Sequence, residues 1–236
     1  MQAASRVTLT GLRRMSTPSK KSHAFPDKKK SVSKNPSGNL AEAISFIMRF
    51  ASAPTSVGAV FPSSRDLAEA MLHGIELEAG DVVVEYGPGT GAFTALLMER
   101  LPEGAEYLGI ERDPHFHGHL QRRFPEKHFH LGSAEEVEAL LEGRGLKKPR
   151  LIISGLPFAS MPHSVQEMIL TATREALHDD GVFRTFTYPI CWYMTGSQRF
   201  RKVALDHFDA HHKSRTVHRN LPPAKVLSYS KPVRKK

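Results

Sequence analysis

The chain has 236 residues, 40% hydrophobic and 24% charged, which suffices for one ordinary α/β domain with short additions. No apolar run approaches the roughly 20 residues of a membrane-spanning helix, which excludes an integral membrane protein. A single cysteine, Cys191, excludes an intrachain disulfide, a cysteine-rich zinc site and a CxxC redox site, and it fits a reducing compartment.

The net charge of +9 is unevenly distributed. Residues 1–38 carry +8, residues 39–210 carry −7 and residues 211–236 carry +8. The first segment is rich in Ser, Lys and Pro and lacks an apolar period, so we expect residues 1–38 to be a disordered basic tail. Basic ends on an acidic body suit a polyanion, either nucleic acid or an anionic lipid surface.

Residues 39–75 are expected to form two N-terminal helices. Asn39 and Glu42 resemble a capping box before a helix over Leu40–Ala51, whose wide apolar face contains Phe46 and Phe50. This helix could lie in a lipid head-group layer or pack on the domain as a lid. Ser63 and Ser64 are expected to cap a second helix over Arg65–Gly74.

From residue 76 to residue 236 the pattern alternates between strand and helix. The expected strands are Asp81–Tyr86, Glu106–Glu111, Lys127–Leu131, Arg150–Ser154, Val182–Tyr188, Lys213–Val217 and Lys225–Tyr229. The expected helices are Ala92–Leu101, Pro114–Arg123, Ala134–Leu141, Ser164–Leu177 and Arg199–Phe208. This alternation predicts a Rossmann-like, doubly wound, mostly parallel seven-stranded sheet with helices on both faces and an N-terminal helical extension.

A glycine loop follows the first strand. It reads Glu85-Tyr86-Gly87-Pro88-Gly89-Thr90-Gly91 and opens a helix whose N-terminus has free N–H groups. Glu85 would repel a pyrophosphate but suits a cationic ligand such as the aminoacyl end of S-adenosylmethionine. Glu111 ends the second strand, where a carboxylate can accept both hydroxyls of a ribose. A tight turn without ligand and an NAD site are the alternatives.

Together these features resemble a class I S-adenosylmethionine-dependent methyltransferase over about Asp81–Tyr188. The resemblance implies S-adenosylmethionine as cofactor. The residues expected to bind it are Ser63, Ser64, Glu85, Tyr86, Gly87, Pro88, Gly89, Thr90, Gly91, Glu111, Arg112, Ser133, Ala134, Ser154, Gly155 and Leu156. Ser133 stands where such enzymes usually have Asp or another polar residue facing the adenine amine.

The end of the fourth strand, Ser154-Gly155-Leu156-Pro157-Phe158, lies where the methyl acceptor must dock. It is similar to the Asn-Leu-Pro-Tyr motif of ribosomal RNA adenine dimethyltransferases, in which an aromatic ring stacks on the target base. Ser154-Gly155 lacks the amide that would hold an adenine amine. This argues against adenine, but the basic ends would serve RNA equally well, so an RNA adenine N6-methyltransferase is kept as the alternative function.

Three further blocks resemble the bacterial phospholipid N-methyltransferase family. They are residues 57–64 (VGAVFPSS), Thr187-Tyr188-Pro189 and residues 219–224 (RNLPPA). The resemblance extends over about Leu40–Tyr229 and implies methylation of phosphatidylethanolamine or an ornithine lipid. The departures are residues 1–38, Ser133 and Thr187-Tyr188-Pro189, where Tyr-Gly-Pro is commoner. They leave the exact lipid open.

For such a reaction, Tyr188 is the candidate catalytic residue, because its ring can face a cationic head group and its hydroxyl can orient the amine. Phe158 and Tyr193 are candidates for contact with the methylated ammonium, and Arg219 for the head-group phosphate. No metal is expected: His115, His117 and His119 would face apart on a helix, and His128 and His130 lack a Cys or carboxylate partner.

The sequence thus predicts a cytoplasmic enzyme that is peripheral on the inner face of the cell membrane and acts on a phospholipid or aminolipid. Its expected partners are this lipid and an anionic membrane surface, with nucleic acid as the second choice. A third hypothesis is a binding module with a vestigial cofactor site. The intact glycine loop and Glu111 argue against it.

Overall fold

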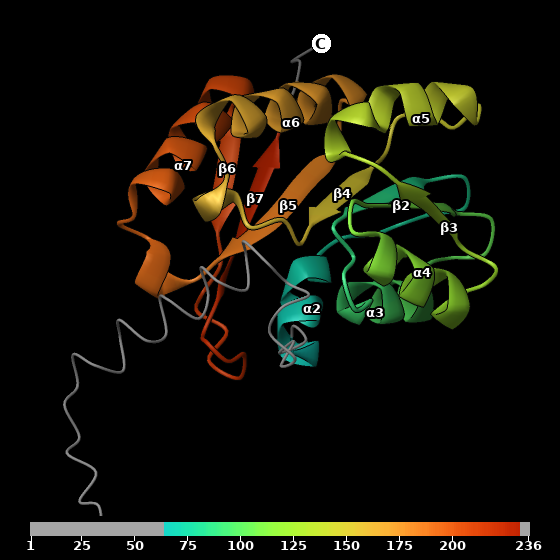
Figure 1. Ribbon diagram of the computed structural model, residues 1–236, viewed down its shortest axis with the longest axis horizontal. Coiled ribbons are helices and arrows are strands. Elements are labelled where there is room, and N and C mark those ends of the chain that lie inside the picture. Colours follow the sequence, from blue (N-terminus) through green and yellow to red (C-terminus); the bar gives the residue numbers. More distant parts are fainter. Residues whose placement is uncertain (1–63, 232–236) are drawn as a thin grey trace, which may run out of the picture. The chain divides into compact units, whose positions relative to one another are not determined.

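The computed structural model describes residues 64–231, which contain one seven-stranded sheet. Its strands are β1 (Val82–Tyr86), β2 (Glu106–Glu111), β3 (His128–Leu131), β4 (Leu151–Ser154), β5 (Val182–Thr187), β6 (Ala210–Lys213) and β7 (Lys225–Ser230). Their order is β3-β2-β1-β4-β5-β7-β6; β7 is antiparallel to both β5 and β6, and the other neighbouring pairs are parallel (Figure 1). The predicted Rossmann-like, mostly parallel sheet is confirmed.

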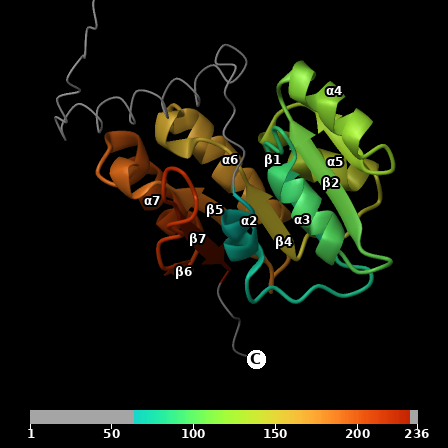
Figure 2. The same cartoon turned by 90° about the horizontal axis from the view of Figure 1, so that it is seen from below.

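Helices cover both faces of this sheet. They are α2 (Arg65–Leu72), α3 (Ala92–Arg100), α4 (Pro114–Arg123), α5 (Val137–Gly143), α6 (His163–Ala176) and α7 (Thr195–His207). Helices α5, α6 and α7 lie on one face, and α2, α3 and α4 on the other (Figures 1 and 2). Strand β1 is buried on both sides, with Val82 and Val84 in the core under α5–α7 and Val83 in the core with α2–α4.

The order of the strands determines where a ligand can bind. Strand β1 lies at the centre between β2 and β4, so the chain winds outward from β1 in both directions. In doubly wound sheets, the crevice at the carboxyl ends of the strands beside such a reversal is the ligand site. The glycine loop after β1, Glu111 at the end of β2 and the segment after β4 all lie at this edge.

The structure differs from the prediction in three elements: the sixth strand, helix α7 and the helix predicted over Ala134–Leu141. The sixth strand is Ala210–Lys213 instead of Lys213–Val217. At Ser214 the regular ladder is interrupted: its N–H still donates to the Val226 carbonyl, but its hydroxyl accepts the Val226 N–H at 2.9 Å, and pairing resumes in an isolated bridge between Val217 and Ala224. Helix α7 begins at Thr195, four residues before the predicted start at Arg199.

The predicted helix Ala134–Leu141 is divided into a 3₁₀ turn, Ala134–Glu136, and α5. Glu136 reaches back to the Ser133 N–H at 2.7 Å, which tightens this first turn. Several expectations concern residues that lie wholly or partly outside 64–231. They are the basic tail 1–38, the helix Leu40–Ala51, the block 57–63 and the boundary of the N-terminal helices at residue 75. Within the described range, no helix is both long and apolar enough to cross a bilayer.

Candidate active site

The glycine loop after β1 has a backbone that side chains would disrupt. Gly87, Gly89 and Gly91 have φ angles of 63°, 57° and 79°, in the left-handed region that favours glycine. At Gly155, after β4, an added Cβ would lie 2.7 Å from the Gly87 carbonyl oxygen. The loops after β1 and β4 therefore touch backbone to backbone, and they form a cradle that only glycine leaves open.

Glu111 holds this loop against the end of β2. Its Oε2 accepts the Gly89 N–H at 2.9 Å and its Oε1 accepts the Asp113 N–H at 2.9 Å. Hydrogen bonds to an ionised carboxylate are the strong ones, so they fix the orientation of the buried side chain. Each oxygen retains a further lone pair. The carboxylate could therefore hold the hydroxyls of a ribose beside the glycine loop, with Arg112 exposed next to it.

Glu85 is fully buried beneath the loop. Its Oε2 accepts hydrogen bonds from Thr94 Oγ1 at 2.8 Å and from the Tyr107 hydroxyl at 2.7 Å. Its Oε1 has no hydrogen-bond partner among the described residues. Burial raises the pKa of this carboxyl to about 7, against the opposing effect of the two donors. The lone oxygen is a buried acceptor that a cationic or N–H-bearing group could satisfy.

These features fit S-adenosylmethionine. The group carries an ammonium for the orphaned oxygen of Glu85, a ribose for Glu111 and atoms that need the open glycine cradle. Ser133 and Ala134 lie after β3, on the far side of Glu111 from β1. The remaining predicted cofactor residues Tyr86, Pro88, Thr90, Ser154 and Leu156 lie in or beside the two loops, with the Ser154 hydroxyl accepting the Leu156 N–H at 3.2 Å.

Ser64 makes hydrogen bonds to Leu67 and Asn220 and not to these loops, and Ser63 is outside the described residues. The Ser64 hydroxyl caps α2 by accepting the Leu67 N–H at 3.1 Å. Its own N–H donates to Asn220 Oδ1 at 2.9 Å. The residue that ends the VGAVFPSS block thus contacts the RNLPPA block, 156 residues later in the chain. These hydrogen bonds give Ser64 a structural role in joining α2 to the segment before β7.

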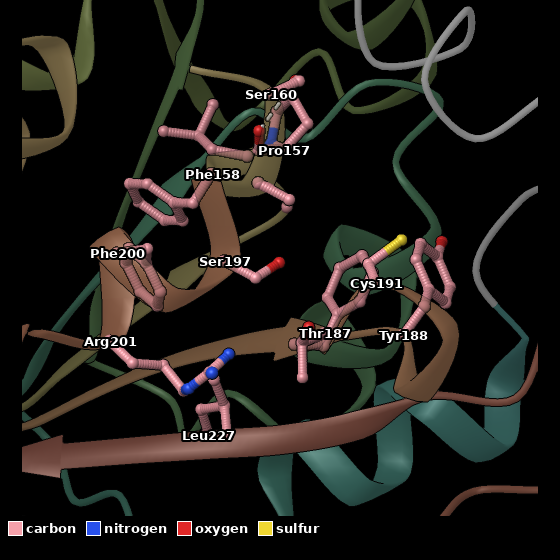
Figure 3. Close-up of a pocket in the computed structure, with 14 residues that line it drawn as sticks. Pro157, Phe158, Ser160, Thr187, Tyr188, Cys191, Ser197, Phe200, Arg201 and Leu227 are labelled. Atoms are coloured by element: carbon pink, nitrogen blue, oxygen red, sulfur yellow. Dashed lines mark hydrogen bonds between the residues drawn. The ribbon is translucent and has the colours of Figure 1, made fainter. Parts of the chain in front are cut away.

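A cavity of about 90 Å³ lies beside the cofactor loops, at the ends of β4 and β5 (Figure 3). Its lining comes from the loop after β4, the end of β5, a 3₁₀ turn at Pro189–Cys191, α7 and β7. The lining residues are Gly155, Leu156, Pro157, Phe158, Ala159, Ser160, Phe186, Thr187, Tyr188, Cys191, Ser197, Phe200, Arg201 and Leu227. Gly155 and Leu156 are shared with the cofactor cradle, so the two spaces adjoin there.

Tyr188 and Phe158, both predicted from the sequence, line this cavity. The Tyr188 ring packs edge-on against Phe186, with centroids 5.6 Å apart, and burial raises the pKa of its phenol to about 12. The phenol is therefore protonated near neutral pH, which favours a role as hydrogen-bond donor over that of a phenolate base. The Phe158 ring stacks on Phe200 at 4.4 Å and forms the inner wall.

The two other predicted substrate residues lie outside the cavity. Tyr193 is 82% exposed. The side chain of Arg219 is 86% exposed and its Nη1 lies 3.8 Å from Asp66 Oδ1, in a surface ion pair. Neither is among the lining residues. The geometry thus brings together Phe158 and Tyr188, but not Tyr193 or Arg219.

Ser197, Phe200 and Arg201 line the cavity and were missed from the sequence. The predicted helix began at Arg199, so Ser197 was left outside it. In α7 these residues are spaced by three and four positions, which places them on one helical face. This spacing is the signal that could have identified them. No cluster of metal-ligating side chains occurs within residues 64–231.

Known proteins similar to this chain are methyltransferases. The family model of the ribosomal RNA adenine dimethylases matches residues 51–132. The ornithine lipid N-methyltransferase of Singulisphaera acidiphila is 29% identical over 182 residues, which cover 76% of this chain and 91% of that protein. The ribosomal RNA small subunit methyltransferase A of Opitutus terrae is 41% identical over 66 residues, or 27% of this chain and 23% of that protein.

Among solved structures, the fibrillarin of Aeropyrum pernix in complex with natively bound S-adenosyl-L-methionine has a TM-score of 0.52 and 17% identity. The similarity covers 69% of this chain and 73% of that one. At this identity the likeness concerns the fold alone. The glycine cradle, the orphaned oxygen of Glu85, the position of Glu111 and the relatives in sequence agree on one class. The chain is a class I S-adenosylmethionine-dependent methyltransferase.

Proposed function

We propose that this methyltransferase transfers a methyl group to the amino nitrogen of an aminolipid head group, either phosphatidylethanolamine or an ornithine lipid. The observation that supports the proposal is how much of this chain aligns with the lipid enzyme and how much with the RNA-methylase family model. The ornithine lipid N-methyltransferase aligns with 76% of this chain, whereas the ribosomal RNA adenine dimethylase model ends at residue 132. The matched RNA-methylase segment contains the glycine loop and Glu111 but ends before β4.

The cavity beside the cofactor loops lies wholly in the part of the chain that this RNA-methylase model does not match. Its lining begins at Gly155 and ends at Leu227. The lining includes Gly155-Leu156-Pro157-Phe158, part of the segment that is similar to the Asn-Leu-Pro-Tyr motif of the RNA enzymes, and further residues from β5, α7 and β7. The likeness to the lipid enzyme is long enough to include them.

The chemistry of the cavity suits an alkylammonium head group. Four aromatic rings, those of Phe158, Phe186, Tyr188 and Phe200, contribute to its lining. Aromatic faces attract ammonium groups, including quaternary ones that have lost every N–H donor. The lining contains no carboxylate, so binding of the amine would not require water to be removed from a negatively charged side chain. Such a wall can hold an amine through successive methylations.

When bound, S-adenosylmethionine supplies an electrophilic methyl group on its sulfonium sulfur. A neutral amine held in the cavity would accept this methyl group, with nitrogen gaining the bond to carbon that sulfur would lose and the positive charge passing from sulfur to nitrogen. The amine must lose a proton to water before attack. Tyr188, protonated near neutral pH, is suited to orient the nitrogen by hydrogen bonding and ring contact. The apolar wall excludes water from the line of attack.

The proposed lipid requires contact with a membrane surface. No helix within residues 64–231 could span a bilayer, so contact would be peripheral. Residues 1–38, with a net charge of +8, are suited to an anionic surface, where each Lys or Arg contributes about 1 kcal/mol. We propose the inner face of the cell membrane as the site of action, with residues 1–75 making the contact.

A reconstituted assay tests this function. The full chain and tritium-labelled S-adenosylmethionine would be incubated with one acceptor in each reaction. The acceptors are phosphatidylethanolamine vesicles, ornithine-lipid vesicles, phosphatidylcholine vesicles and unmodified ribosomal RNA. We expect label in at least one of the two aminolipids and none in phosphatidylcholine. A Glu111→Ala variant serves as the inactive control.

Label confined to RNA would overturn the proposal and favour the alternative, RNA adenine N6-methylation, which the match over residues 51–132 supports. Absence of label from every acceptor, with cofactor binding intact, would also contradict it. Expression in cells that lack methylated phospholipids gives a second test. New mono-, di- or trimethylated lipids are expected in the extract.

A further inference from the structure

Arg201 is the one charged side chain among the residues that line the acceptor cavity. It lies on α7, and its guanidinium points into the space between Phe200 and Thr187 (Figure 3). The guanidinium carbon lies 3.8 Å from the centroid of the Trp192 ring. Within residues 64–231, no carboxylate lies within ion-pair distance of it. A partly buried cation without a counter-ion is costly unless a ligand supplies one.

A second cation shares the same aromatic ring. Lys213, the last residue of β6, places its Nζ 4.4 Å from the Trp192 centroid. Lys213 also takes part in no ion pair within residues 64–231. Lys213 is exposed and is not among the residues that line the cavity, so it adds positive charge near Trp192 from outside the site.

A hydroxyl without a partner completes the arrangement. Ser197 is only 4% exposed, and its Oγ has no hydrogen-bond partner in the part of the chain that the structure describes. It lies one helical turn before Arg201, and its hydroxyl points into the same cavity (Figure 3). A buried hydroxyl costs free energy unless its hydrogen bond is made, so this group also calls for a polar ligand atom.

We propose that Arg201 and Ser197 form an anion subsite that holds the negatively charged group of the methyl acceptor. The inference rests on the proposed function and specifies which acceptors it includes. A guanidinium and a hydroxyl match the oxygens of a phosphate or a carboxylate. Phosphatidylethanolamine carries a phosphate and an ornithine lipid carries a carboxylate, each a few bonds from its amine. The acceptor is thus selected as a zwitterion, and Arg201 takes the role that the sequence suggested for Arg219.

The subsite predicts a specific order of binding for soluble head-group probes. O-phosphoethanolamine carries the phosphate, Nα-acetylornithine carries the carboxylate, and ethanolamine carries the amine alone. Each would be titrated against the full chain saturated with S-adenosylhomocysteine and followed by ligand-observed NMR. We expect at least one zwitterion to bind roughly 10- to 100-fold more tightly than ethanolamine, as one or two charge-assisted hydrogen bonds imply.

Arg201→Gln keeps a planar group for the Trp192 ring but removes the charge, and it should abolish this preference. Arg201→Lys should retain part of it, and Ser197→Ala should reduce it by roughly 3- to 10-fold. Lys202→Gln is the matched control, an exposed cation on the same helix and outside the cavity, and it should bind as the wild type does. The melting temperature of each variant reports on folding.

Two results would overturn the subsite: a wild-type chain without preference for either zwitterion, or a folded Arg201→Gln variant that keeps the wild-type preference. The lipid assay distinguishes this failure from that of the proposed function. Methylated aminolipid with an unchanged lipid KM in Arg201→Gln would refute the subsite alone. Arg201-dependent binding of a zwitterion without methylation of either lipid would refute the lipid function alone.

Discussion

The two halves of the active-site edge are built in different ways. On the side of β1 and β2, the site is made of backbone: three left-handed glycines and a carboxylate that accepts two main-chain N–H groups. On the side of β4 and β5, it is made of side chains, with aromatic rings around Ser197 and Arg201. Among the described residues, each half holds one buried polar atom without a hydrogen-bond partner, Glu85 Oε1 in the first and Ser197 Oγ in the second. Cofactor binding thus depends on preformed geometry, and acceptor choice on a few side chains.

The largest effect is expected where the two halves touch. Gly155→Ala would place a Cβ 2.7 Å from the Gly87 carbonyl oxygen and push the two loops apart. We expect methyl transfer to fall by more than about 100-fold, since small displacements of a reacting group cost that much. S-adenosylhomocysteine affinity should fall with it. Gly143→Ala, whose Cβ meets nothing within 4 Å, is the control. Wild-type activity in Gly155→Ala would show that the cradle is not needed.

A substitution in the acceptor half should leave cofactor binding intact. Tyr188→Leu removes the ring and the hydroxyl from the cavity, and we expect acceptor kcat/KM to fall roughly 10- to 100-fold. Tyr188→Phe keeps the ring and should lose less than about 10-fold, because a phenol with a pKa of about 12 is not the base. A loss of 100-fold or more in Tyr188→Phe, or weaker S-adenosylhomocysteine binding in either variant, would contradict this division.

The buried Glu85 should make stability depend on pH. Its pKa is raised from 4.5 to about 7, so between these pH values the native state holds a proton that the unfolded chain has already released. The free energy of unfolding should therefore decrease as the pH rises from about 4.5 to 7, by up to about 3 kcal/mol. Glu85→Gln should flatten this decline in urea denaturation at a series of pH values. A variant with the wild-type slope would show that another group is responsible.

The smallest effect is expected at Arg219. Its ion pair with Asp66 is exposed, and such pairs contribute about 0.2–1 kcal/mol. Arg219→Ala should therefore change the melting temperature slightly and leave the lipid KM within about 2-fold, in contrast to Arg201→Gln. If the KM rose as much as in Arg201→Gln, the head-group anion would have to be sought at the surface.

The cofactor half was largely predictable from the sequence because its signals are local. Glycines that require a left-handed backbone, and an acidic residue at the end of the next strand, lie within 25 residues of one another. The acceptor half joins residues from Gly155 to Leu227 through tertiary packing. Phe158 and Tyr188 were predicted because they follow β4 and β5, at the sheet edge where this fold binds its ligands. Arg201 lies inside a helix, where only the shared face with Ser197 distinguishes it from other surface cations.

The correction at β6 has a similar cause. Of the predicted strand 213–217, Lys213 ends β6 and Val217 pairs with Ala224 in an isolated bridge, while the Ser214 hydroxyl takes the place of a carbonyl between them. Whether a Ser or Thr hydroxyl replaces a main-chain hydrogen-bond partner depends on the tertiary structure, which the alternation of polar and apolar residues does not reveal.

Calorimetric titration with S-adenosylhomocysteine tests the central claim most directly, that the glycine cradle and Glu111 bind a sulfonium nucleoside. We predict one site per chain in the full-length protein, and an affinity roughly 30- to 100-fold weaker in Glu111→Ala, which loses two charge-assisted contacts. Glu106→Ala, an exposed acid at the opposite end of β2, should bind as the wild type does. No binding heat with either S-adenosylhomocysteine or S-adenosylmethionine in the wild-type chain, or unchanged affinity in Glu111→Ala, would contradict the account.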